Sequence, residues 1–193
     1  MVFKKHSMKR LFLFVVVVLL ATVSAFAQKP DDEQGTILHG PRISFVLKEP
    51  PGWVLDTQTA RAQGLEAVLY NEGSSWKNAV AVMYARVIDK DASQDTVEKV
   101  ISNDIAEFMK LSAKSEVSDS PAIQTRDKRQ AVVKVFYDAA NKNYESVAFI
   151  DDKRVVVILA LSSRDKAQYE KALPAFQALV SSYLVFTPLT PPE

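Results

Sequence analysis

The stretch that most constrains the fold is Val155–Leu161, an unbroken run of aliphatic and β-branched residues. The run is too short to span a membrane, and charged residues bound it on both sides. Such a run is typical of a strand that is buried on both faces of a sheet. Each face then needs a cover, so the sequence must supply two amphipathic helices.

Both helices can be found by their hydrophobic period. The first is predicted over residues 96–114, with Asp95 as its N-cap. The second closes the chain after Leu161, where Ser162 and Asp165 have the spacing of a capping box. Pro174 is predicted to kink or split this closing helix.

The remaining apolar segments predict strands. Residues 130–138 and 144–151 precede the buried run as two strands of the same sheet, and residues 115–125 suit an edge strand because they contain a proline. Further upstream, strands are predicted at residues 43–47, 65–70 and 79–88, most simply as a meander. The predicted fold class is α/β of the α+β type: a single-domain α/β/α sandwich with a mainly antiparallel sheet and a helix on each face.

The N-terminus has the three parts of a secretory signal peptide: basic residues, the apolar segment Leu11–Val23, and small residues at Ala25 and Ala27. We expect cleavage between Ala27 and Gln28, and the alternative is an uncleaved membrane anchor. The expected organisation is then a signal peptide (1–27), a flexible lead-in (28–36), a folded domain (37–186) and a proline-rich tail (187–193). This predicts a secreted or periplasmic protein that has no membrane contact after cleavage.

Composition narrows the function classes. The formal net charge of +1 includes four basic residues of the leader, so it falls to −3 after cleavage and a nucleic-acid partner is not expected. The chain has no cysteine, which excludes disulfides, a lipoprotein anchor and thiolate metal sites. Stability must therefore come from the core alone.

Three segments resemble parts of the PsbP-like family, which is named after an accessory protein of the photosynthetic oxygen-evolving complex. Ile43–Leu55 (ISFVLKEPPGWVL) resembles its opening strand and Pro-Gly-Trp turn. Tyr144–Ser163 and Tyr169–Phe186 resemble the last hairpin and closing helix of bacterial members, so the resemblance spans residues 43–186. It implies an antiparallel sheet with helices on both sides and a role in binding or assembly, as in photosystem accessory proteins or a relative that binds the GTPase Ran.

Residues that could carry chemistry are few. His39 is the one histidine after the leader, it precedes a Gly-Pro turn, and no Gly-x-Ser-x-Gly elbow accompanies it. The segment Asp89–Asp95 imitates the start of a calcium loop, but it lacks the glycine at position six and the glutamate at position twelve. Asp151 and Asp152 are paired carboxylates at a predicted hairpin turn, where aspartate is common for backbone reasons. We therefore expect no enzyme, no cofactor and no metal site.

Two surface features are candidates for partner contact. One is the basic cluster of Arg126, Lys128 and Arg129, whose alternative is a solvated hairpin tip. The other is Trp76, which either folds back on the sheet or meets a partner. Trp53 is expected in the core.

The function expected from these observations is an exported, non-enzymatic accessory or binding protein with an unknown protein partner. The first alternative is a periplasmic or extracellular protein that binds a small molecule or lipid in a cavity between sheet and helix. A hydrolase is the third candidate function.

Overall fold

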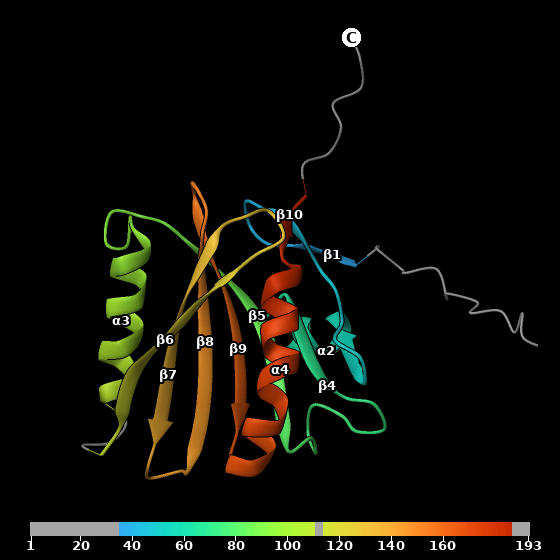
Figure 1. Cartoon of the computed structure of the whole chain (residues 1–193). Coiled ribbons are helices and arrows are strands. Elements are labelled where there is room, and N and C mark those ends of the chain that lie inside the picture. The colour runs from blue at the N-terminus through green and yellow to red at the C-terminus, as the bar shows by residue number, and fades with distance from the viewer. Residues whose placement is uncertain (1–34, 111–113, 187–193) are drawn as a thin grey trace, which may run out of the picture. The chain divides into compact units, whose positions relative to one another are not determined.

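In a computed structural model, which describes residues 35–110 and 114–186, the doubly buried run lies in the middle of a seven-stranded sheet (Figure 1). All neighbouring strands pair antiparallel. From edge to edge the strands are β3 (Trp53–Asp56), β4 (Ala67–Asn71), β5 (Ala81–Asp89), β9 (Val155–Ser163), β8 (Asn143–Asp151), β7 (Gln130–Asp138) and β6 (Glu116–Gln124). As predicted, β6 is an edge strand, and its register shifts between Ser120 and Ile123, on either side of Pro121.

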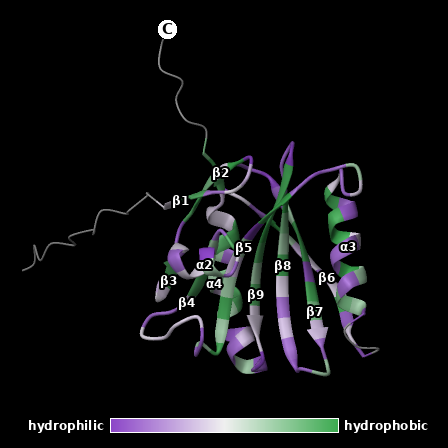
Figure 2. Cartoon of the chain, turned by 180° about the vertical axis from the view of Figure 1, so that it is seen from behind, coloured by the Kyte–Doolittle hydropathy of each residue, from purple (hydrophilic) through white to green (hydrophobic). Residues whose placement is uncertain are grey.

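One long helix covers each face of the sheet, which confirms the predicted sandwich. On β9, Val156 and Ile158 join a core with α3 (Val97–Met109), whereas Val157 and Leu159 join a core with α4 (Lys166–Ser182). Figure 2 shows hydrophobic residues gathered in the middle of the sheet and along one side of α3. Among the described residues, no helix has both the length and the hydropathy needed to cross a membrane.

The predicted first strand belongs to a separate sheet. β2 (Ser44–Leu47) pairs with β1 (Thr36–His39) on one side and with β10 (Leu184–Val185) on the other. The prediction of one meander was therefore wrong at its start, because β10 follows α4 directly and takes the position beside β2. The rings of Phe45 and Tyr183, 5.5 Å apart, fill the space beneath this small sheet. A short helix, α2 (Thr57–Ala62), was also not predicted, and Asp56 caps it by accepting from the Thr59 backbone N–H at 2.8 Å.

Three details of the long helices differ from prediction. Thr96, not Asp95, caps α3, since the Asp95 carboxylate instead pairs with Lys99 at 2.8 Å. Asp165, not Ser162, caps α4 by accepting from the Gln168 backbone N–H at 3.0 Å. Pro174 does not split α4, because it lies on the exposed side of the helix, where solvent can satisfy the carbonyl that loses its partner.

Candidate functional site

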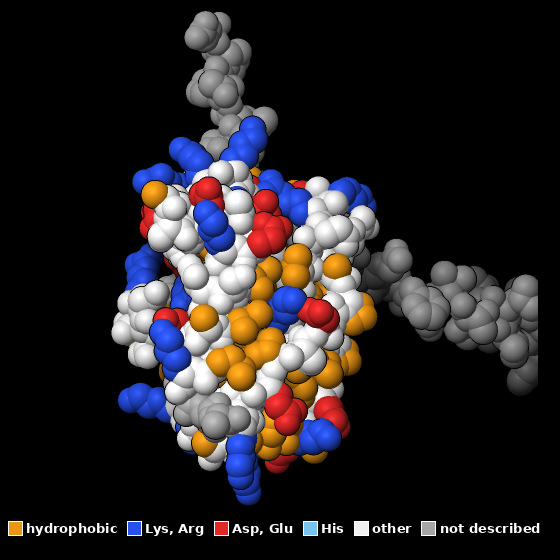
Figure 3. Space-filling model, turned by 90° about the vertical axis from the view of Figure 1, so that its left-hand side faces the viewer, with side chains coloured by type: hydrophobic (Ala, Val, Ile, Leu, Met, Phe, Trp, Pro, Cys, Tyr) orange, Lys and Arg blue, Asp and Glu red, His pale blue; other side chains and the backbone are white. Residues whose placement is uncertain are grey.

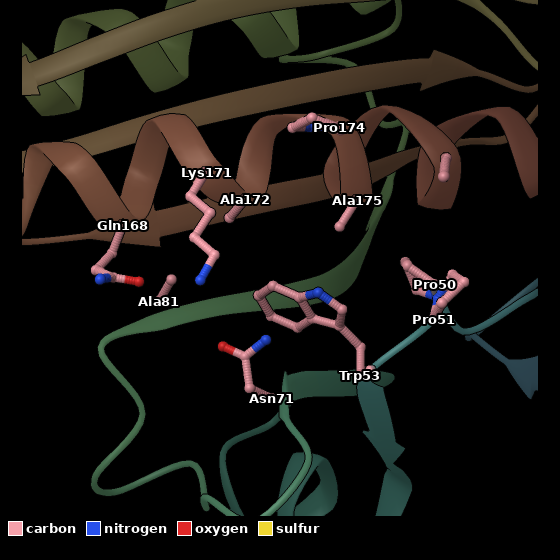
Figure 4. Close-up of a pocket in the computed structure, with 12 residues that line it drawn as sticks. Pro50, Pro51, Trp53, Asn71, Ala81, Gln168, Lys171, Ala172, Pro174 and Ala175 are labelled. Atoms are coloured by element: carbon pink, nitrogen blue, oxygen red, sulfur yellow. The ribbon is translucent and has the colours of Figure 1, made fainter.

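The main candidate site is a pocket between α4 and the turn that leads into β3. It has a volume of about 460 Å³ and is partly open to solvent. Figure 4 shows the helix as one wall and the turn with Trp53 as the other. Its lining consists of Pro50, Pro51, Gly52, Trp53, Asn71, Ala81, Gln168, Lys171, Ala172, Pro174, Ala175 and Ala178.

The turn fixes the tryptophan wall of the pocket. The Trp53 backbone N–H donates to the Pro50 carbonyl at 3.0 Å, and Gly52 has a φ of +78°, which a residue with a side chain rarely adopts. Trp53 then pairs with Asn71 across β3 and β4. Its side chain is 7% exposed, so the indole belongs mainly to the core, as predicted, and one part of it faces the pocket. The Pro-Gly-Trp turn thus gives the pocket a rigid aromatic wall.

The helix wall comes from one stripe of α4. Gln168, Lys171, Ala172 and Ala175 fall at helical spacing on the face turned toward Trp53. The alanines have short side chains, so the helix and the turn leave a groove between them instead of closing into contact. Pro174 and Ala178 extend this wall.

The lining of the pocket carries positive charge and no negative charge. Lys171 is the one charged residue in the lining, and no acidic residue lines the pocket. Within the described part of the chain the Lys171 ammonium makes no ion pair, and the Trp53 indole N–H makes no hydrogen bond. The site therefore offers two hydrogen-bond donors that have no partner in the described residues, the Lys171 ammonium and the Trp53 indole N–H. The side-chain amides of Asn71 and Gln168 also line the pocket.

The structure does not bring the predicted basic cluster to this pocket. Arg129 is held in ion pairs, with Nη1 2.5 Å from Asp152 Oδ2 and Nε 2.9 Å from Asp127 Oδ2. The pair with Asp152 connects the β6–β7 turn to the β8–β9 turn, and the pair with Asp127 lies within the β6–β7 turn. Arg126 and Lys128 are exposed in the same turn, where Lys128 has a φ of +69°.

Trp76, the other predicted contact residue, lies in the loop between β4 and β5. Its side chain is half-buried, and it is not among the residues that line the pocket. The pocket itself was not predicted. Its lining combines residues 50–53, Asn71 and Ala81 with residues 168–178, which lie far apart in the sequence, and the Pro-Gly-Trp turn was the one local signal.

The aspartates that imitate a calcium loop form a hydrogen-bonded turn. Asp91 Oδ1 accepts from the Ser93 backbone N–H at 2.7 Å and the Ser93 hydroxyl at 2.6 Å, and these bonds lower the pKa of the Asp91 carboxyl. At the β8–β9 turn, Asp151 pairs with Lys90, and Asp152 pairs with Arg129. No group of three or more potential metal ligands occurs in the residues that the structure describes.

A second, polar pocket contains His39, Ser44 and Asp152. His39 Nδ1 lies 2.9 Å from Ser44 Oγ. The Asp152 carboxylate, however, accepts from Arg129 at 2.5 Å and from the Lys153 backbone N–H at 2.7 Å. In the described ranges His39 therefore has no carboxylate to orient it, and the arrangement is a pair instead of a triad.

Hydrophobic side chains are also exposed beside α3. Val132 and Met109 are 37% and 44% exposed, and Figure 3 shows a hydrophobic band on this face of the molecule. An ion pair between Lys134 and Asp119 lies on the neighbouring strands β7 and β6.

Comparison with known proteins identifies the fold. No protein family profile matches the sequence, and no curated protein is similar to it in sequence. The structure is similar to that of the cyanobacterial PsbP protein CyanoP of Synechocystis sp. PCC 6803, with a TM-score of 0.51 and 10% identity over 80% of this chain and 94% of that one. It is also similar to LpqN, which is involved in cell envelope biogenesis of Mycobacterium tuberculosis, with a TM-score of 0.53 and 13% identity over 80% of this chain and 91% of that one. The resemblance predicted from the sequence is thus confirmed at the level of structure: this chain has a PsbP-like fold.

Proposed function

We propose that this chain is an exported, non-enzymatic accessory protein that binds a protein partner at the pocket between α4 and the Pro50–Trp53 turn. The observation that carries the proposal is the form of this pocket. It is an open groove with a rigid aromatic wall, and its lining contains a single charged side chain. Protein interfaces are enriched in such aromatic anchors and depleted of charge at their centre.

The proposal of export rests on the leader, which lies outside the described residues. Basic residues, the apolar segment 11–23 and the Ala25-Phe26-Ala27 site follow one another in the order that signal peptidase substrates require. Mass spectrometry of the protein recovered from the exported fraction should find Gln28, possibly cyclised, at the N-terminus. A mature protein that retains residues 11–23 would contradict export with cleavage.

Site-specific photo-crosslinking tests the partner site. A photoreactive amino acid at Pro51, which is exposed on the rim of the groove, should give one discrete crosslinked product in the exported fraction. The same group at Glu107, exposed on α3, serves as the control and should not give that product. If both positions gave the same products, or neither gave any, the groove would not be the partner site.

A small-molecule or lipid binder is the second candidate, because the volume of about 460 Å³ and the largely apolar walls are also those of ligand pockets. Native mass spectrometry of the protein purified from its own host distinguishes the two candidates. A bound mass that is lost on substitution of Ala175→Trp, which fills the groove, would favour the ligand. Turnover of hydrolase substrates by the purified protein would instead favour an enzyme.

A further inference from the structure

The groove carries a positive charge that nothing in the described part of the chain neutralises. Lys171 extends from α4 across the groove toward Trp53 and Asn71 (Figure 4). Five residues earlier on the same helix, Lys166 pairs with Glu170 at 3.7 Å, whereas Lys171 has no such pair within residues 35–110 and 114–186. An anion that enters the groove would therefore meet an available cation.

The neighbouring donors favour the same kind of ligand. The Trp53 indole N–H is a donor only, and in the described residues it has no acceptor. A partner that covers this donor must supply an oxygen, because a buried donor without an acceptor costs free energy. Backbone carbonyls and carboxylates both supply such oxygens.

The length of the groove indicates an extended ligand. Its helix wall runs from Gln168 to Ala178, which corresponds to about 15 Å along the axis at about 1.5 Å per residue. An extended peptide rises about 3.3 Å per residue, so about four residues fit along this wall. The apolar walls, with Pro50, Trp53 and Ala175, match apolar or prolyl side chains, as aromatic-lined peptide grooves do.

We propose that the groove binds an extended segment of a partner protein in which an apolar or prolyl residue is followed by an acidic residue. The apolar side chain contacts Trp53 and the alanines of α4, and the carboxylate pairs with Lys171. This inference rests on the proposed function, because it specifies the partner's chemistry at the same groove. The hydrophobic band beside α3 carries no such assignment, because nothing in the structure shows what covers it.

Fluorescence anisotropy of labelled peptides tests the inference on the chain from Gln28 to Glu193. The probes are fluorescein-Pro-Leu-Pro-Glu-amide and the matched peptides that end in Gln or Lys. We expect the Glu peptide to bind about three- to tenfold more tightly than the Gln peptide, as for a charge-assisted bond at a partly exposed site. Lys171→Gln should remove this preference, and Lys171→Glu should transfer it to the Lys peptide. Lys171 is exposed, so neither substitution should impair folding.

Two controls test whether the preference for the Glu peptide arises at Lys171 in the groove. Lys166→Gln removes a charge from the same helix outside the groove and should leave the preference unchanged. The indole N–H resonance of Trp53 should shift on addition of the Glu peptide, while that of Trp76 should not.

The inference is overturned if no peptide binds at millimolar concentration, if the preference survives Lys171→Gln, or if free 4-phenylbutyrate binds as tightly as the Glu peptide. If Lys171→Glu left the Pro51 crosslink intact, the groove would remain the partner site while the acidic-segment inference failed. The conclusion would be the same if the Ala175→Trp variant lost the Pro51 crosslink and the Lys171→Glu variant kept it: the groove would be the partner site, and the acidic-segment inference would fail.

Discussion

Ile158 and Leu159 are consecutive residues of β9, yet their side chains are buried in different hydrophobic cores on opposite faces of the sheet. Ile158 is 1% exposed and lies in the core under α3, and Leu159 is 0% exposed and lies in the core under α4. The two helices therefore stabilise the same strand from both sides. Both cores are needed for stability, because neither face of the sheet is exposed to solvent at this strand.

Truncation on either face should destabilise the protein by a similar amount. We expect Ile158→Ala and Leu159→Ala each to lower the free energy of unfolding by about 2 to 4 kcal/mol, through lost burial and a residual cavity. Urea denaturation of the two variants measures this loss. Val80→Ala is the control, since Val80 is 59% exposed and should change stability little. An unchanged stability for either core variant would mean that one face of β9 is not covered.

A buried hydrogen bond connects α4 to β8. The hydroxyls of Tyr169 and Ser146 lie 2.6 Å apart, and both residues are buried. Tyr169→Phe should cost about 1 to 2 kcal/mol, because it leaves the Ser146 hydroxyl without this partner. The double variant with Ser146→Ala should cost less than the sum of the two single variants. Additive losses in a double-mutant cycle would show that this bond contributes nothing beyond packing.

The central fold could be predicted because its signals are local. The run Val155–Leu161 and the helical period of α3 each report burial by themselves, and together they require a covered sheet. The second sheet could not be predicted in the same way. β10 contains two residues, and its pairing with β2 joins positions near opposite ends of the domain. No periodicity can be read from so short a strand.

The candidate site was less predictable than the fold. Trp53 was expected in the core, which its exposure of 7% confirms, but its second role as a pocket wall depends on α4. The groove exists because the short side chains of Ala172 and Ala175 do not fill the space between α4 and the Pro50–Trp53 turn. A sequence does not show which alanines face such a space. Arg129 is a further example, because its ion pair with Asp152 became visible only once the β6–β7 and β8–β9 turns were placed together.

A half-buried carboxylate makes stability depend on pH. Burial raises the pKa of the Glu145 carboxyl, and hydrogen bonds from Ser162 and Asn143 oppose this effect only in part. Below about pH 4.5, the ordinary value, the carboxyl is protonated in both the folded and the unfolded chain. As the pH rises, the unfolded chain ionises first, so stability is lost as the pH rises toward and through the folded pKa.

Glu145→Gln should remove this loss. We expect the variant to unfold at a higher temperature than the wild type at pH 8, and the difference to shrink toward zero near pH 4. Thermal melts across this range measure the difference. Glu72→Gln, at an exposed position of the β4–β5 loop, is the matched control and should show a smaller dependence on pH. If the wild type were the more stable protein at pH 8, the hydrogen bonds to Glu145 would outweigh its burial.

Metal ions should leave the stability of the protein unchanged. The carboxylates that could hold a hard cation are Asp89, Asp91, Asp151 and Asp152, and the structure engages them in other ways. Asp91 accepts hydrogen bonds within its own turn, and Asp151 pairs with Lys90. Calcium requires six or more oxygen ligands, so each cluster lacks the number that binding at micromolar concentration needs.

A ligand stabilises a protein only through its preference for the folded state. Melting the chain from Gln28 to Glu193 with a chelator, and then with millimolar calcium, magnesium or zinc, should therefore give transitions that overlap within about one degree. Asp91→Ala distinguishes a specific site from a general effect of salt. A rise of several degrees with calcium that this substitution abolishes would establish an ion site in the turn between β5 and α3. Since that turn lies at neither the groove nor Lys171, such a result would assign the protein an ion-dependent function separate from peptide binding.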